Sequence, residues 1–119
     1  MDDATIDILK NTLTIDFSTI GAKSGKPSRI EIWAWWFEDR YLITGTPGPR
    51  HWMANIAKNP EVVVHVRDLD LPGRATVVDD REFRRRFFES RESAWYKTQV
   101  ELDALVETAP MIEIAFESE

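Results

Sequence analysis

The stretch LTIDFSTIGAKSGKPSRIEIWAWWF, residues 13–37, decides the fold of this chain. Its first part alternates apolar Leu13, Ile15 and Phe17 with polar residues, which is the period-two pattern of a strand with one buried face. The turn Gly21-Ala22-Lys23-Ser24-Gly25-Lys26-Pro27 follows, and its glycines and proline favour reversal of the chain. Residues 29–37 resume as a second strand, so the sequence predicts a β-hairpin.

The second strand of this hairpin is apolar on both faces. One face carries the first set, Ile30, Ile32, Ala34 and Trp36. The other face carries the second set, Glu31, Trp33, Trp35 and Phe37. A barrel interior explains the first set, and the second set must meet a helix, a second subunit or a flat ligand, because monomers seldom expose a contiguous aromatic patch. A dimer interface is one interpretation, and a dimer interface that also lines a cofactor slot is the other.

Outward from the hairpin, the pattern predicts four further strands, at residues 40–46, at 61–67, ending near 78 after a turn around Leu71-Pro72-Gly73, and at 111–116. A short helix is expected to run through Ala57, and one or two helices fill residues 80–107, where Asp79 and Glu82 form a capping-box pattern. Six antiparallel strands predict a mainly β, α+β fold that closes into a small barrel, since closure removes exposed edges. One domain spans residues 1–119, of which 1–10 form either a helical turn or a frayed, flexible arm.

Composition bounds the function. The 119 residues are 43% apolar and 30% charged, which is typical of a globular domain, and the net charge of -6 disfavours nucleic acid or anionic lipid as a partner. The absence of cysteine excludes disulfides and thiolate chemistry, and two isolated histidines predict no metal site. Without an apolar signal core or a run of roughly 20 apolar residues, we expect a cytoplasmic protein with no membrane span.

Two segments could hold an anion or a flat ligand. The turn at 21–27 and Arg29 carry three positive side chains, which form either a phosphate site or a solvated hairpin tip. Gly45-Thr46-Pro47-Gly48 permits close approach of a ligand to the backbone. Arg50 and His51 open the next helix, where free amides favour anions, so they are either a phosphate clamp or surface groups.

Other charged residues suggest no chemistry. The run Arg84-Arg85-Arg86 is surrounded by acidic residues, so we expect a solvated helix face. His65 lies on the polar side of its strand and is assigned no role. Neither histidine predicts a Ser-His-Asp arrangement, and no isolated carboxylate pair points to glycoside hydrolysis.

The order of these motifs resembles that of the deazaflavin-dependent nitroreductases, which belong to the flavin-binding split-barrel superfamily beside pyridoxamine phosphate oxidase. The turn GAKSGKP, the strand end YLITGT at 41–46, W-x-x-N at 52–55 and NPEV at 59–62 carry the resemblance, which is clear over residues 13–67. It implies a homodimer of six-stranded split barrels. Each would bind coenzyme F420, or FMN in related branches, in a groove between barrel and partner.

Carried across by position, the resemblance also implies the site residues. The cofactor would contact the turn, the loop after the third strand and the short helix, through Ala22, Lys23, Ser24, Gly45, Thr46, Pro47, Trp52 and Asn55. Trp33, Thr46 and Tyr96 would lie on the catalytic side of the ring. Ser28 replaces an arginine of the family and Pro47 removes a backbone donor, so both bear on the choice of cofactor. F420 is favoured over FMN, because the turn and the W-x-x-N helix resemble the deazaflavin branch, and Lys26, Arg29 and Arg50 would serve its long anionic tail.

The predicted function is that of an oxidoreductase. A reduced deazaflavin or flavin would transfer a hydride to a small organic acceptor such as a quinone or a nitro compound. The protein then supplies binding and orientation, which explains why the sequence shows no catalytic constellation. The alternatives are a non-catalytic module that stores a flavin or deazaflavin, an FMN-dependent oxidoreductase, and a dimeric protein with a structural role.

Overall fold

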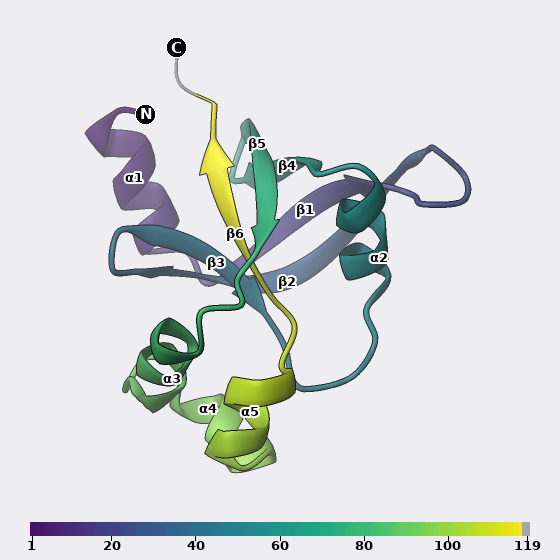
Figure 1. The fold of residues 1–119 in the computed structure, drawn as a ribbon. Coiled ribbons are helices and arrows are strands. Elements are labelled where there is room, and N and C mark those ends of the chain that lie inside the picture. Colours follow the sequence, from purple (N-terminus) through teal and green to yellow (C-terminus); the bar gives the residue numbers. More distant parts are fainter. Residues whose placement is uncertain (118–119) are drawn as a thin grey trace.

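The sheet within residues 1–117 has six strands: β1 (Thr14–Ile20), β2 (Pro27–Phe37), β3 (Arg40–Thr44), β4 (Glu61–Val66), β5 (Leu69–Val77) and β6 (Met111–Phe116). A computed structural model, which describes residues 1–117, shows them closed into an antiparallel barrel in the order β1-β2-β3-β6-β5-β4 (Figure 1). Strand β1 pairs with both β2 and β4 and thereby closes the barrel. The predicted six-stranded α+β barrel is confirmed.

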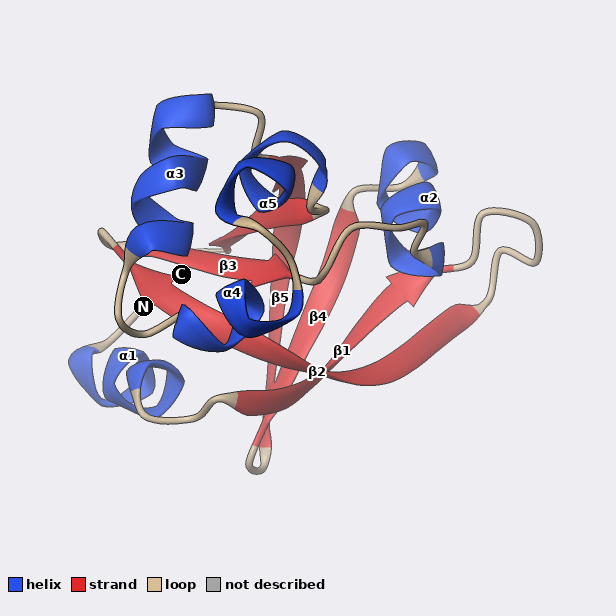
Figure 2. Cartoon of the chain, turned by 90° about the horizontal axis from the view of Figure 1, so that it is seen from below, coloured by secondary structure: helices blue, strands red, loops and turns tan. Residues whose placement is uncertain are grey.

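Five helices lie in the same residues: α1 (Asp3–Lys10), α2 (His51–Lys58), α3 (Arg81–Glu89), α4 (Ala94–Gln99) and α5 (Leu102–Thr108). Helices α3, α4 and α5 gather at one end of the barrel, and α2 lies apart from them (Figure 2). The prediction of one or two helices over 80–107 is wrong, because extended backbone at Ser90 and Val100 divides the segment into three. Within residues 1–117, no helix has the length and apolar character needed to span a membrane.

The turn between β4 and β5 lies earlier than the sequence predicts. Val66 pairs with Leu69, so residues 67–68 form a two-residue turn, in which Arg67 takes a left-handed φ of 55°. Pro72 and Gly73 instead lie inside β5. A Cβ on Gly73 would come within 2.8 Å of Ile114 Cγ2 and 2.9 Å of the Ala115 carbonyl oxygen, so the glycine permits close approach to β6.

The N-terminus of α3 also differs by one residue from the prediction. Asp80, not Asp79, is the N-cap, and its side chain accepts hydrogen bonds from the backbone N–H groups of Glu82 (3.1 Å) and Phe83 (3.3 Å). At the other end of the chain, α1 begins at an N-cap formed by Asp2, whose carboxylate accepts from the Thr5 N–H at 2.8 Å. Leu9 of α1 is buried in the barrel core.

Strand β2 contributes to two hydrophobic cores. Its first set of side chains packs into the barrel interior, around residues such as Phe17 and Ile43. Its second set packs under α3, α4 and α5, where Trp35 meets Phe87 with ring centroids 5.9 Å apart and Phe37 meets Phe83 at 5.7 Å. From the sequence, this second face of β2 had to meet a helix, a second subunit or a flat ligand. The structure shows that helices cover it.

Strand β2 also changes its pairing partner along its length. Residues 27–33 pair with β1, whereas residues 34–37 pair with β3, which ends at Thr44. The edge of β2 before Ala34 therefore has no strand on the β3 side. This opening in the barrel wall positions the candidate site.

Arg84 is buried, so the predicted solvated face is wrong for this residue. Its guanidinium donates hydrogen bonds to the carbonyl oxygens of Val78 (2.9 Å), Leu105 (3.2 Å), Val106 (2.7 Å) and Ala109 (2.5 Å). These carbonyls end β5 and α5, so one side chain joins both to α3. Burial lowers the pKa of Arg84, and the four hydrogen bonds offset the cost of holding the charge there.

We expect Arg84→Ala to lower the free energy of unfolding by about 3 kcal/mol or more, because it leaves buried carbonyls without donors. Arg85→Ala is the matched control. Arg85 pairs with Asp103 at 2.9 Å on the surface, so its loss should cost less than about 1 kcal/mol. Urea unfolding of both variants measures the difference, and equal losses would show that the Arg84 hydrogen bonds do not stabilise the helical end.

Candidate functional site

A groove runs along the open edge of β2 and consists of two adjoining cavities. The first, the aromatic cavity, has a volume of about 330 Å³ and is lined by Ile32, Trp33, Thr44, Gly45, Thr46, Arg50, Trp95 and Tyr96. The second, the helix cavity, has about 350 Å³ and is lined by Thr19, Ser28, Ile30, Glu31, Ile32, Pro49, Arg50, His51, Trp52 and Asn55. Both include Ile32 and Arg50, so they adjoin, and together they are called the groove.

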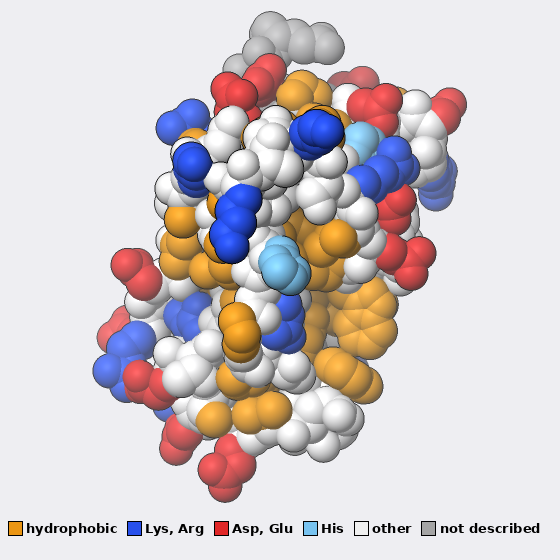
Figure 3. Space-filling view, turned by 90° about the vertical axis from the view of Figure 1, so that its right-hand side faces the viewer, with side chains coloured by type: hydrophobic (Ala, Val, Ile, Leu, Met, Phe, Trp, Pro, Cys, Tyr) orange, Lys and Arg blue, Asp and Glu red, His pale blue; other side chains and the backbone are white. Residues whose placement is uncertain are grey.

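The floor of the groove consists of side chains that the barrel leaves uncovered. Ile30 and Ile32 pack on the barrel core but are only partly buried, because β3 does not pair with this part of β2. Figure 3, which faces the side with α2 and the β1–β2 turn, shows apolar side chains between basic ones. The groove is therefore apolar along its base.

Three aromatic side chains form one wall of the aromatic cavity. Trp33 lies edge-to-face against Trp95, with ring centroids 5.1 Å apart, and 6.4 Å from Tyr96. Trp95 is 47% exposed, so about half of its surface is free to contact a flat ligand. The Tyr96 hydroxyl accepts a hydrogen bond from Trp35 Nε1 at 3.1 Å, and burial raises the pKa of Tyr96, so this phenol stays protonated at neutral pH.

The opposite wall is the loop between β3 and α2. Arg50 donates from Nη2 to the Thr46 carbonyl (2.8 Å) and Oγ1 (3.3 Å), and from Nη1 to the carbonyls of Gly48 and Pro49 (both 3.3 Å). A Cβ on Gly45 would lie 3.0 Å from Arg50 Nη2, so the glycine makes room for the guanidinium. Arg50 is thus neither a free phosphate clamp nor a solvated surface residue, the two alternatives that the sequence leaves open. Its side chain holds the loop in place through these hydrogen bonds.

The first turn of α2 lies at the helix cavity. Its N-cap makes no side-chain hydrogen bond, and within residues 1–117 the amides of His51 and Trp52 have no hydrogen-bond partner. Free amides at a helix N-terminus favour an anion. Trp52 is 5% exposed and packs edge-to-face on Phe17 at 6.0 Å, so most of its ring belongs to the barrel core.

Asn55 links the groove to the β1–β2 turn. Its Oδ1 accepts from the Ala22 N–H at 2.9 Å, and its Nδ2 donates to Thr19 Oγ1 at 2.9 Å. Lys58 Nζ donates to the Ala22 carbonyl at 2.9 Å. The turn, with exposed Lys23 and Ser24, is thereby held at the end of the groove.

The structure brings most of the predicted residues to this groove. Trp33, Gly45, Thr46 and Tyr96 line the aromatic cavity, and Trp52 and Asn55 line the helix cavity. Ala22, Lys23, Ser24 and Pro47 line neither of them. Trp95, Ile30 and Ile32 were not predicted as site residues from the sequence; the only sequence signal for Trp95 is its position directly before Tyr96.

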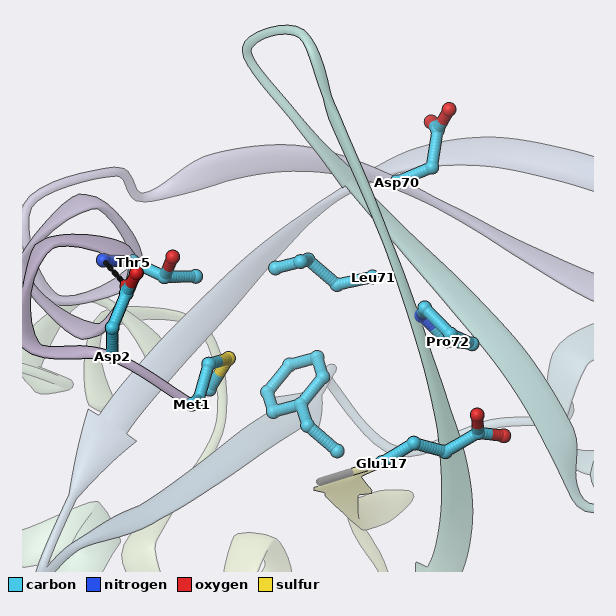
Figure 4. A pocket seen from close by; sticks show the side chains of 8 residues that line it. Met1, Asp2, Thr5, Asp70, Leu71, Pro72 and Glu117 are labelled. Carbon is cyan, nitrogen blue, oxygen red and sulfur yellow. Dashed lines mark hydrogen bonds between the residues drawn. The ribbon is translucent and has the colours of Figure 1, made fainter. Parts of the chain in front are cut away.

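A larger hollow of about 530 Å³ lies between α1 and the ends of β5 and β6 (Figure 4). Its lining includes the three carboxylates of Asp2, Asp70 and Glu117, and no Lys, Arg or His side chain. Such a surface favours neither an anion nor a stacked ring. No group of three His, Asp or Glu side chains within residues 1–117 is arranged to hold a metal ion.

Comparison with models of protein families assigns the chain to one family. The model described as F420H(2)-dependent quinone reductase matches residues 7–107. The chain belongs to this family. As a member of the F420H(2)-dependent quinone reductases it is an F420-dependent reductase, so the resemblance, the enzyme class and F420 as cofactor are confirmed.

Solved structures share the fold of this chain. An F420-H2 dependent reductase is 25% identical, with a TM-score of 0.62 over 86% of this chain and 93% of that chain. An F420 reductase is 20% identical, with a TM-score of 0.68 over 99% and 97% of the two chains. A Clostridium acetobutylicum protein of the pyridoxinephosphate oxidase family is 14% identical, with a TM-score of 0.72 over 96% and 82%. Comparison with curated proteins finds no match.

The residues of the groove fit F420. The apolar floor and the Trp33–Trp95 pair suit a flat ring, since aromatic rings prefer such edge and face contacts. The long anionic tail needs positive charge or free N–H groups, and these lie at the other end, on the α2 amides and the lysines of the turn. The groove thus has an apolar, aromatic end and an end with free N–H groups, next to which the lysines of the turn lie.

Proposed function

We propose that this F420-dependent reductase passes the hydride to a quinone held in the aromatic cavity. The supporting observation is the composition of that cavity: indole and phenol rings, small loop residues and no carboxylate. The only cation there, Arg50, already donates to loop carbonyls. A flat, uncharged ring needs no ionic partner and gains from burial of its faces, so a quinone suits this environment.

The chain orients the reactants and needs no nucleophile of its own. When bound, reduced F420 supplies a hydride, and a quinone becomes a hydroquinone by taking that hydride and one proton. We assign Trp33 to the border between cofactor ring and acceptor. Thr46 Oγ1 accepts from Arg50, so its own proton is free to donate to a ring oxygen. Tyr96 is held by Trp35 and keeps its proton, which makes it the second hydroxyl on the acceptor side.

We further propose that Ala22, Lys23 and Ser24 bind the anionic tail, while Gly45, Pro47, Trp52 and Asn55 shape the path between ring and tail. The turn is braced to α2 through Asn55 and Lys58, which supports a defined position for Lys23. Gly45 and Pro47 belong to the loop that Arg50 holds. Asn55 acts here as a positioning residue, because both ends of its amide bind protein atoms.

We propose also that the protein is a homodimer, in which a partner covers part of the groove. Two observations support this. The groove is open along β2, and the large apolar side chains of Val77 (50% exposed) and Trp95 (47% exposed) face solvent in one chain. Association would bury these surfaces and exclude water from the ring.

An anaerobic assay tests the acceptor. Reduced F420 should be oxidised rapidly with a water-soluble quinone and slowly with a nitroaromatic compound, as followed by absorbance. Trp95→Ala should raise the KM for the quinone about tenfold, because an aromatic contact worth about 1.4 kcal/mol is lost, whereas Trp95→Phe should retain most of it. Preference for the nitro compound would overturn the quinone proposal and leave the F420 assignment intact.

Lys23→Ala should weaken F420 binding by a factor of about 10 to 100, because one charge-assisted contact to the tail is worth about 1.5 to 3 kcal/mol. The control is Lys97→Ala, which removes an exposed lysine on α4 that lines neither cavity. Fluorescence titration at two salt concentrations measures both effects, and salt should reduce the advantage of wild type over Lys23→Ala. Equal affinities of wild type and Lys23→Ala would show that the turn is a solvated hairpin tip.

Light scattering tests the dimer. At micromolar concentration we expect a mass of about twice the 13.8 kDa of one chain, since burial of Trp95 and Val77 contributes about 1.5 to 3 kcal/mol for each large side chain. Trp95→Ala should shift the equilibrium toward monomer. A mass of one chain at every concentration would contradict a groove shared between subunits.

A further inference from the structure

Three polar side chains form a continuous hydrogen-bonded chain on the outer face of the barrel. Ser18 Oγ lies 2.7 Å from His65 Nε2, and His65 Nδ1 lies 2.7 Å from Asp70 Oδ1. None of the three lines the groove. From the sequence we expected no Ser-His-Asp arrangement, and the hydrogen bonds of His65 contradict that expectation.

The strand registers bring these residues together. Ser18 lies on β1, His65 on β4 and Asp70 on β5, and these strands are neighbours in the barrel. His65 pairs directly with Asp70 across β4 and β5, and with Asp16, two residues before Ser18, across β4 and β1. Side chains of alternate residues share a face, so Ser18 and Asp16 project to the same outer side. Figure 4 shows Asp70 projecting away from Leu71, its inward-facing neighbour.

The chemistry of the partners determines where the protons lie. An ionised Asp70 carboxylate can only accept, so in the neutral imidazole Nδ1 carries the proton and donates a hydrogen bond to Asp70 Oδ1. Nε2 then has a free lone pair, and the Ser18 hydroxyl must donate to it. This is the protonation pattern in which a histidine acts as general base toward a serine.

The surroundings of Ser18 suit attack on an ester. Ser18 is partly exposed, so its oxygen is accessible. Its cross-strand neighbours are Arg29 on β2 and Val63 on β4. Within residues 1–117 only Nε of Arg29 has a partner, Asp16 Oδ2 at 2.9 Å, so its two terminal nitrogens are free to donate to a developing oxyanion. Val63 and the adjoining Pro72 offer an apolar surface for a short acyl chain.

We propose that Ser18, His65 and Asp70 form a second active centre, in which Ser18 is the nucleophile toward small esters with a short apolar acyl group. Ser18 Oγ bonds to the carbonyl carbon as its proton passes to His65 Nε2. The ester C–O bond then breaks, and the leaving alkoxide takes that proton. Water attacks the acyl-serine by the reverse proton path, which releases the carboxylic acid and restores Ser18. Asp70 is the positioning residue, because it holds the imidazole tautomer.

A fluorophosphonate probe tests the nucleophile, since it forms a stable bond only with an activated serine. Mass spectrometry of the trypsin-digested full-length protein should place the label on residues 11–23, which contain Ser18. Exposed Ser28 on the neighbouring strand lies in a different peptide, 24–29, and serves as an internal control. Label on both peptides in equal amounts, or on neither, would overturn the proposal.

Variants separate activation from structure. Ser18→Ala should abolish labelling and p-nitrophenyl acetate hydrolysis above background, and His65→Gln should lower the labelling rate at least about a hundredfold, as loss of a general base does. Asp70→Asn should lower the rate, and Asp70→Glu should restore much of it. Thermal unfolding of each variant provides the control for folding. A labelling rate unchanged in His65→Gln would show that the three residues form only a hydrogen-bonded clip between strands.

Discussion

The division of β2 between two partners is the constraint on which the rest of the structure depends. Up to Trp33 the strand is held by β1, and from Ala34 onward by β3, so the barrel wall opens where β3 stops. A longer β3 would cover Ile30 and Ile32 and close the groove. The same strand supplies the floor of the site with one face and the seat of the helices with the other. A change in β2 therefore affects both the groove and the hydrophobic cores.

Local patterns predicted the strands well, because alternation of buried and exposed side chains is a property of each segment by itself. They predicted the β4–β5 turn poorly. Pro72 and Gly73 have the stronger turn chemistry, yet the chain reverses at Arg67, where pairing of the flanking strands supports a left-handed φ in a residue other than glycine. The burial of Arg84 was not predicted for a related reason. Its hydrogen-bond partners lie at the ends of β5 and α5, and only the assembled fold brings their carbonyls together.

The candidate site shows the same limit. Gly45 and Thr46 could be assigned from the sequence because small residues after a strand are a local signal, whereas Trp95 entered the site only through the packing of α4 against Trp33. Asn55 lay in a predicted position but turns its amide toward Thr19 and Ala22. Residues that hold a site in place are harder to recognise from sequence than residues that line it, since their partners are other parts of the chain.

The loop held by Arg50 has a thermodynamic consequence. Its carbonyls accept hydrogen bonds from the guanidinium of the same chain, so contacts within the chain hold this wall of the groove in place. Ordering a loop on binding costs conformational entropy, and a preassembled wall avoids that cost. Such a wall also adapts little. The ring must match a shape that exists beforehand, so the loop selects among planar ligands by their outline.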